Sequence, residues 1–386
     1  MAGAAQGLLD EVDGMKLGTH ATARRTLVVG APAIMGAAIL LGLVTPILLT
    51  GYWTKIATLA AVFSAVAAGA GLLYGRLGYV SLNQVALTGV GGWVFLRIAH
   101  EVALPSPVLL VLAGAVTCVI GTVIGLPSLR LNGLILALVS LMAAGAFEIL
   151  FYGTGFPDGG GGFTGRATGA QLARTVPRPD FATSDDAMFR YTVIVVGILF
   201  LILWVTLRGR VGRAWAAIRQ SEAGAYATGV PVTRYRLLAL ALTSFSTGVA
   251  GALLATGTGR LDPISFPAQQ NIVLFAVVLI GGAYSLFGGV LAGLLYVAFP
   301  AVLNDLGIDA NLVLVILGLG LVQALVTAPR GMAGQVQGLM ARLRLPEHVL
   351  SGSAGRSPDR PRGDQTGEPA EGSSDLGASE RAAQDA

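Results

Sequence analysis

Long apolar runs, most of them close to the length that crosses a lipid bilayer, constrain the fold of this chain more than any other feature. A helix rises about 1.5 Å per residue and needs about 20 apolar residues to cross about 30 Å of hydrocarbon. The chain is 54% hydrophobic and 12% charged, against about 25% charged residues in soluble domains. We therefore predict an all-α, polytopic transmembrane helical bundle with spans at 26–50, 56–74, 81–98, 107–126, 132–152, 191–207, 237–258 and 311–328, and a longer apolar tract at 271–303.

The tract 271–303 decides how many spans the bundle has. As one helix, its 33 residues would be about 50 Å long, which is too long for a single crossing. The stretch GGAYSLFGG at 281–289 is a plausible break, because glycine weakens a helix interior. Two short crossings fit this length, and so does one crossing with a re-entrant piece.

The distribution of basic residues favours ten spans over nine. Cytosolic loops of membrane proteins carry an excess of Lys and Arg. With ten spans and the N-terminus inside, fourteen basic residues face the cytosol and seven face outward, four of them in one long loop at 153–190. Nine spans would put the basic stretch after Pro329 outside. We therefore predict about ten spans with both termini in the cytosol. The inner basic residues are Lys16, Arg24, Arg25, Arg76, Arg130, the six arginines of 208–236, Arg330, Arg342 and Arg344.

The two ends of the chain carry no predicted span. Residues 1–25 are expected to form a cytosolic N-terminal segment, and the acids at Asp10, Glu11 and Asp13 argue against a cleavable signal peptide. The transmembrane domain would cover 26–345. Residues 346–386 are polar and rich in Gly, Pro and Ser, which predicts a disordered cytosolic tail.

The sequence lacks the residues that most enzymes and metal sites need. Its single cysteine, Cys118, cannot form an intrachain disulfide, and its three histidines lie outside the apolar runs. No G-x-x-x-x-G-K-[ST] motif occurs, and Lys16 and Lys55 are the only lysines, so the chain cannot build a P-loop. Its basic residues lie between apolar runs, as topology signals do. We expect no catalytic residue, no metal, no cofactor and no nucleic-acid binding, and any ATP must be bound by separate subunits.

The inner loop 208–236, which we call the elbow, combines charge with a pattern of secondary structure. It carries six arginines and one acid, Glu222. Ser221 and Thr233 are suited to cap helices, and Gly229 is suited to end one before Pro231. Spacing predicts a helix that packs one apolar stripe against the membrane domain. Such an elbow would be a docking surface, the alternative being a loop that only holds its arginines inside. The stripe consists of Val211, Ala214, Trp215 and Ile218.

A few polar residues in or beside the apolar runs are candidates for a solute path. Ser81, Asn83 and Gln84 begin one span, and Ser285 occupies in GAYSL the place of Ser81 in GYVSL. They either line the path or cap and connect helices. Glu148 is the only acid well inside an apolar run, where a charge costs about 2.5–3.5 kcal/mol. It would contact a solute amino group, carry a proton, or simply reach the membrane interface.

Five stretches between about residues 75 and 334 carry a further signal. They are GYVSLNQVALTGVGGW (78–93), LRLNGLILALVSL (129–141), the elbow with Arg-Ala-x-x-Ala-Ile-Arg, GGAYSLFGGVLAG (281–293) and APRGMAG (328–334). In this order they resemble the permeases of branched-chain amino-acid (LIV-type) ABC importers. Two departures concern the solute region. Asn83 stands where that family has Gly, and GTGFPDGGGGFTG (153–165) matches its outer loop only loosely.

This resemblance implies the permease subunit of an ABC importer in the bacterial plasma (inner) membrane, translocating branched-chain or other small amino acids. Its partners would be two ATP-binding subunits, a second permease chain of the same or another kind, and an external solute-binding protein. The resemblance places the ATPase contact, built around a coupling helix, at Arg213, Arg219, Glu222, Ala223 and Gly229. Three alternatives stay open: an ABC permease for urea or short amides, a proton-coupled secondary transporter using Glu148, and a non-transporting scaffold.

Overall fold

The computed structural model describes residues 51–129, 131, 133–167, 173–308, 310–327 and 332–333. These residues form helices and connecting turns, with no strand among them, which confirms the all-α prediction. Seven of the described helices are long and apolar enough to cross a membrane. The predicted segment 1–25, the span 26–50 and the tail 346–386 lie outside the described residues. The count of ten spans and the cytosolic placement of both termini therefore stay predictions.

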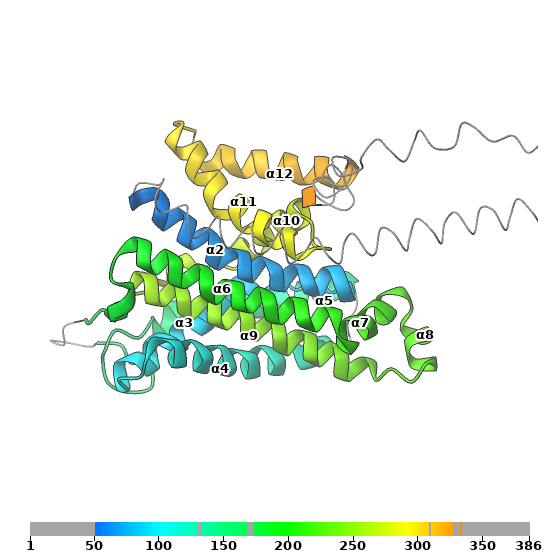
Figure 1. Ribbon diagram of the computed structural model, residues 1–386, viewed down its shortest axis with the longest axis horizontal. Coiled ribbons are helices and arrows are strands. Elements are labelled where there is room, and N and C mark those ends of the chain that lie inside the picture. The colour runs from blue at the N-terminus through cyan, green and yellow to red at the C-terminus, as the bar shows by residue number, and fades with distance from the viewer. Residues whose placement is uncertain are drawn as a thin grey trace, which may run out of the picture. The chain divides into compact units, whose positions relative to one another are not determined.

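The described helices follow the apolar runs in chain order (Figure 1). The seven candidate spans are built from α2 (Gly51–Leu72) with its π-helical end η2 (Leu73–Leu77), α4 (Ser106–Ser128), α5 (Gly133–Thr154), α6 (Asp185–Arg208), α9 (Val232–Thr258), η4 (Pro263–Ser265) with α10 (Gln269–Gly281), and α11 (Leu286–Asp305). The remaining elements are α3 (Gln84–Glu101), η3 (Asp180–Ala182), α7 (Arg210–Gln220), α8 (Glu222–Ala227) and α12 (Ala310–Thr327).

Helices α6 and α9 begin several residues earlier than the apolar runs predict. Helix α6 begins at Asp185, six residues before the run 191–207, because the Ser184 side chain caps it by accepting from the Ala187 N–H at 3.2 Å. Asp185 and Asp186 in its first turn also suit the positive end of the helix dipole. Helix α9 begins at Val232, so its first turn belongs to the elbow. Hydropathy does not mark these polar first turns, and the outer loop is correspondingly shorter than 153–190.

Helices α3 and α9 pack against each other through glycine at the centre of the bundle. A Cβ atom on Gly251 would lie 1.9 Å from the Thr88 carbonyl oxygen, and one on Gly91 would lie 2.3 Å from the Gly248 carbonyl oxygen. Neither contact is possible, so these positions admit only glycine at the present spacing. Close backbone approach through small residues is how membrane helices commonly associate.

The tract 271–303 is divided where its glycines predict a break. Helix α10 ends at Gly281, and Gly282 has a φ of 110°, a conformation that favours glycine. Ser285 then caps α11 by accepting from the Gly288 N–H at 3.0 Å. With η4, the first piece covers Pro263–Gly281 and is a candidate span by length. This favours two crossings over one crossing with a re-entrant piece.

The loops gather at two ends of the bundle. At one end, which we call the long-loop end, Lys55 and Asp185 lie 3.6 Å apart, and Arg178 donates to the Gly257 carbonyl at 3.1 Å. At the other, the elbow end, Arg219 of α7 donates to the Tyr74 carbonyl. The contacts at each end join loops that would lie on the same side of a membrane if successive helices crossed it in alternating directions. This agrees with the predicted order of crossings.

Candidate functional site

The elbow is a folded unit with its apolar stripe buried. Ala214, Trp215 and Ile218 of α7 are buried, and Val211 packs against the core while half-buried. The Trp215 indole N–H donates to the Tyr235 carbonyl at 2.8 Å, which ties α7 to the start of α9. This confirms the predicted stripe, and it holds α7 and α8 at the elbow end of the bundle (Figure 1).

Helix α8 is short, capped at both ends and largely exposed. Ser221 caps its start by accepting from the Gly224 N–H at 3.1 Å. At its end Gly229 has a φ of 79°, and its N–H and that of Val230 donate to the Tyr226 and Ala225 carbonyls. These two bonds are the Schellman arrangement that ends many helices at a left-handed glycine. The caps predicted at Ser221 and Gly229 are therefore confirmed.

The predicted cap at Thr233 is wrong. Helix α9 already begins at Val232, with Pro231 as the preceding residue and no side-chain cap. The Pro231 carbonyl accepts the N–H groups of Arg234 and Tyr235 instead. The fixed φ of proline suits the residue that precedes a helix. Because the helix begins directly after Pro231, Thr233 is already inside its first turn and cannot be its cap.

The exposed face of α8 leaves a surface for a partner. Ala223, Tyr226 and Gly229 are all exposed, Tyr226 at 53% of its full area. A Cβ atom on Gly229 would meet nothing within 4 Å, so this turn is open to solvent in the isolated chain. Arg213 of α7 is exposed as well. Four of the five residues assigned to the ATPase contact are therefore exposed: Arg213, Arg219, Ala223 and Gly229.

Two of the five, Arg219 and Glu222, also have partners within the chain. Arg219 donates to the Tyr74 carbonyl and, at 3.1 Å, to the Tyr284 hydroxyl. Glu222 accepts from the Arg236 Nη2 at 2.6 Å. Arg219 thus reaches the π-helical end of α2 and the break between α10 and α11. Glu222 turns back toward α9.

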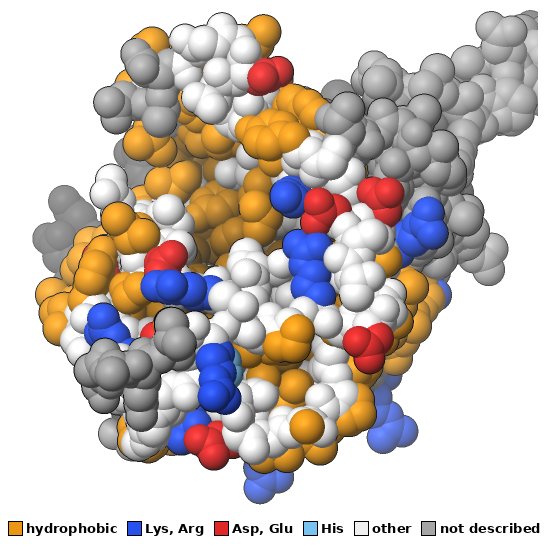
Figure 2. Space-filling model, turned by 90° about the vertical axis from the view of Figure 1, so that its left-hand side faces the viewer, with side chains coloured by type: hydrophobic (Ala, Val, Ile, Leu, Met, Phe, Trp, Pro, Cys, Tyr) orange, Lys and Arg blue, Asp and Glu red, His pale blue; other side chains and the backbone are white. Residues whose placement is uncertain are grey.

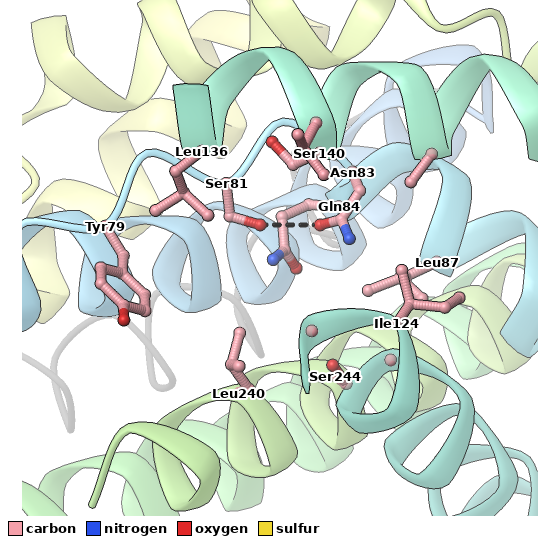
Figure 3. Close-up of a pocket in the computed structure, with 14 residues that line it drawn as sticks. Tyr79, Ser81, Asn83, Gln84, Leu87, Ile124, Leu136, Ser140, Leu240 and Ser244 are labelled. Carbon is pink, nitrogen blue, oxygen red and sulfur yellow. Dashed lines mark hydrogen bonds between the residues drawn. The ribbon is translucent and has the colours of Figure 1, made fainter. Parts of the chain in front are cut away.

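A cavity lies between the 79–84 segment, α4, α5 and α9 (Figure 3). None of its lining residues is charged, and apart from six polar ones the lining is aliphatic or glycine. Its volume of about 40 Å³ has room for about three water molecules, so the helices would have to part before an amino acid could enter. The polar lining residues are Tyr79, Ser81, Asn83, Gln84, Ser140 and Ser244.

The structure brings together three of the residues predicted for the solute path. Ser81 donates to the Asn83 Oδ1 at 2.7 Å, and neither residue's side chain caps α3. The Gln84 Oε1 accepts from the Thr247 hydroxyl at 2.7 Å, and the residue is only 2% exposed. Its amide points into the cavity (Figure 3).

Three polar residues of this cavity were not predicted, Tyr79 and two serines. Ser140 of α5 accepts from the Leu82 N–H at 2.9 Å, and Ser244 of α9 is buried in the wall. Each lies inside an apolar run, where a lone serine is an ordinary helix residue. The resemblance of 129–141 to the permease family was the available signal for Ser140, and nothing local marked Ser244.

Glu148 and Ser285 lie away from this cavity and hold helix starts. The Glu148 Oε2 accepts from the Ala268 N–H at 2.8 Å, at the N-terminus of α10. A carboxylate is favourable there because helix N-termini carry unpaired N–H groups and partial positive charge. Ser285 caps α11. The sequence could not show these partners, since Ala268 is 120 residues from Glu148.

The long-loop end is ordered by backbone contacts. Arg97 donates to the Gly162 and Phe163 carbonyls, and Asp158 accepts from the Ala167 N–H. Figure 2 looks onto this end and shows basic and acidic side chains scattered over it, with a hollow whose walls are apolar. Within the described residues, no group of His, Cys, Asp and Glu could hold a metal ion.

Comparisons with known proteins identify relatives of this chain. The profile of a family described as "Branched-chain amino acid transport system / permease component" matches residues 52–325. The high-affinity branched-chain amino acid transport system permease protein LivM of Salmonella typhimurium is 30% identical over 269 residues, covering 65% of this chain and 63% of the relative. LivM of Escherichia coli is 28% identical over 288 residues, covering 70% and 68%.

A more distant relative covers less of the chain. The ribose import permease protein RbsC of Bacillus subtilis is 31% identical over 134 residues, or 33% of this chain and 41% of the relative. No solved structure matches. The similarity to the first relative thus spans slightly under two thirds of its length.

Proposed function

Because this chain belongs to the family of permease components of branched-chain amino acid transport systems, we propose that it is the membrane-spanning permease subunit of an ABC importer for branched-chain or other small neutral amino acids. It does no covalent chemistry and uses ATP hydrolysed by two separate ATP-binding subunits. The sequence contains no P-loop of its own.

The observation that carries this proposal is the shape of the elbow. A loop that only anchored charge would need no buried tryptophan, no Ser221 cap and no left-handed Gly229, yet all three are present. Together they hold α8 as a short rigid helix with exposed Ala223, Tyr226 and Gly229. Such a helix suits insertion into a cleft of an ATPase subunit, so that movement of the ATPase is transmitted to the membrane helices.

The cavity supports the solute class. Its lining combines hydroxyl and amide groups with aliphatic side chains and no charge. A solute with a net charge would lose its hydration there without gaining a counterion, which is costly. The ammonium and carboxylate groups of a zwitterion balance each other and can hydrogen-bond to amide and hydroxyl groups. A net-neutral solute with a small apolar side chain could exchange water hydrogen bonds for those of Gln84, Ser140 and Ser244. We place Ser81, Asn83 and Gln84 on this path and assign Glu148 and Ser285 to helix ends.

The remaining partners and the location follow from the family. We propose a bacterial inner-membrane protein that pairs with a second permease chain and receives solute from an external binding protein at the long-loop end. In this arrangement the elbow and both termini face the cytosol, with 26–345 as the membrane domain. A cytosol-only fluorescent reporter fused after Ala386 should be bright, and activity of a periplasm-only reporter there would contradict the ten-span topology.

Uptake of radiolabelled leucine into cells expressing the whole transporter tests the function. Uptake should require the partner ATPases and should continue when the proton gradient is collapsed while ATP is maintained. Competition with unlabelled valine, lysine, glutamate and urea should be strong only for valine. Loss of uptake with the gradient at constant ATP would indicate a proton-coupled transporter, and competition by urea alone would indicate the amide-type alternative.

A further inference from the structure

Next to the cavity lies a buried arginine whose counterion is on α8. Arg236 of α9 is 8% exposed and lies one helical turn before Leu240, which lines the cavity. Its guanidinium stacks over the ring of Tyr79, another lining residue, at 5.1 Å. Arg236 Nη1 and the Tyr79 hydroxyl both lie 3.5 Å from the Leu129 carbonyl at the end of α4. Tyr79 thus connects the cavity wall to the pair formed by Arg236 and Glu222.

Glu222 of α8 is the counterion of Arg236. Its carboxylate is the one acid that pairs with Arg236 among the described residues, at 2.6 Å. The pair is asymmetric, since the Arg236 side chain is 10% exposed and the Glu222 side chain is 40% exposed. The Arg236 Nε is buried and has no hydrogen-bond partner, so the guanidinium already lacks part of its hydration. Removing Glu222 would leave a buried, uncompensated cation, which is strongly unfavourable.

We propose that Arg236 and Tyr79 form the inner gate of the solute path, and that Glu222 latches this gate to α8. The proposal rests on the proposed function for its role in transport. When α8 is displaced, Glu222 moves with it and Arg236 loses its counterion. The long arginine side chain then swings toward water, as such side chains readily do at membrane interfaces. Tyr79 loses its stacking partner, and the cavity opens toward the elbow end.

Glu222 acquires a different role from the one that the family resemblance suggests. It is a positioning residue that faces into the permease, while Ala223, Tyr226 and Gly229 face outward. The link between partner and gate is therefore short, since Glu222 is the first residue of the same six-residue helix that carries the exposed surface.

A cysteine in the cavity reports the state of the gate. The reporter is Ser244→Cys, in a chain whose single native cysteine is removed by Cys118→Ala. A membrane-impermeant thiol reagent is added to inside-out vesicles, which present the elbow end. With Glu222→Gln we expect labelling about tenfold faster, a factor that corresponds to about 1.4 kcal/mol. Glu222→Asp keeps the charge and should label near the parent rate.

Matched controls separate a gate from general loosening. Arg234→Gln removes an exposed arginine from the first turn of the same helix and should leave labelling unchanged. A second control keeps native Cys118 and omits the Ser244→Cys reporter. Cys118 is on α4, outside the cavity lining, so it should label at the same rate with and without Glu222→Gln. If Glu222→Gln folds poorly, the double variant Glu222→Gln/Arg236→Gln carries no unpaired charge and should also label fast.

Unchanged labelling in both the Glu222→Gln variant and the double variant would overturn the gate. Equal acceleration in Arg234→Gln, or at Cys118, would do the same by showing that the whole bundle loosens. Labelling needs neither ATPase nor solute, whereas uptake needs both. The labelling experiment can therefore refute the gate while the transporter assignment stands, and the uptake experiment can refute the transporter assignment while the labelling result stands.

Discussion

The Arg219 guanidinium donates a hydrogen bond to the Tyr284 hydroxyl at 3.1 Å across 65 residues of chain. It also lies 5.1 Å from the Tyr284 ring centre and bonds the Tyr74 carbonyl. One side chain of the elbow thus contacts the π-helical end of α2 and the break between α10 and α11. Pi-helical turns and broken membrane helices are frequent at functional sites, so this contact is suited to transmit motion of the elbow to two helices at once.

We predict that Arg219→Gln lowers transport while the elbow stays folded, because Trp215 still anchors α7. A hydrogen bond to a charged group contributes about 1.5–3 kcal/mol to stability. Because Arg219 is exposed, screening by solvent makes the contribution of its hydrogen bonds smaller. We expect a several-fold loss of uptake with unchanged protein levels. Tyr284→Phe removes one of the two hydrogen bonds and should have a smaller effect. Arg210→Gln, at an exposed arginine of the same helix, should transport normally, and an equal loss there would refute the role of Arg219.

Gly229→Val tests the exposed turn of α8. The φ of 79° is unfavourable for a β-branched residue by about 1–3 kcal/mol. Because a Cβ atom would meet nothing within 4 Å, the cost is confined to the turn. We expect normal insertion but weakened co-purification of the ATP-binding subunits, or ATP hydrolysis without transport. Gly229→Asn, which tolerates the left-handed conformation, should behave like the parent. Normal coupling in Gly229→Val would exclude this turn from the contact.

Gln84→Leu tests the cavity. It removes a buried amide, and a hydrogen bond contributes about 0.5–1.5 kcal/mol, so we expect the KM for uptake to rise by about two- to tenfold. Thr88→Val is the matched control, because Thr88 is equally buried on α3 but bonds only the Gln84 carbonyl of its own helix and does not line the cavity. If both variants have the parental KM, Gln84 does not contact solute.

Glu148→Gln separates a structural role from a proton site. The amide oxygen can still accept from the Ala268 N–H, and only the charge at the α10 N-terminus is lost, at about 0.3–1 kcal/mol. We expect uptake within about twofold of the parent. Glu148→Leu removes the acceptor as well and should lower the thermal stability of the purified protein. Abolished uptake in a stable Glu148→Gln protein would support proton coupling.

Gly251→Ala tests the α3–α9 crossing. The new Cβ would lie 1.9 Å from a backbone oxygen of Thr88, so the helices must separate, and overpacking of this kind costs about 1–3 kcal/mol or more. We expect a lower unfolding temperature in detergent. Gly145→Ala on α5, where a Cβ meets nothing within 4 Å, should match or exceed the parent. Equal stability of the two variants would mean that the crossing is not closely packed.

Local patterns in the sequence determined where most helices of this protein lie and where several of them end. Runs of apolar residues predicted the long helices of the described region, because a membrane requires each segment to satisfy its own backbone hydrogen bonds. Glycines predicted the break after Gly281, and Ser221 and Gly229 predicted the limits of α8. All of these depend on residues within a few positions of each other.

Only the tertiary structure decided which side chains meet. It turned Glu222 inward to Arg236, gave Glu148 the Ala268 N–H as a partner, and placed Ser140 and Ser244 in the wall of one cavity with Gln84. These contacts join segments that are distant in the chain or lie on different helices. Helical periodicity tells which residues share a face. It does not tell which face of another helix lies opposite, because that depends on how closely glycines such as Gly251 let the backbones approach.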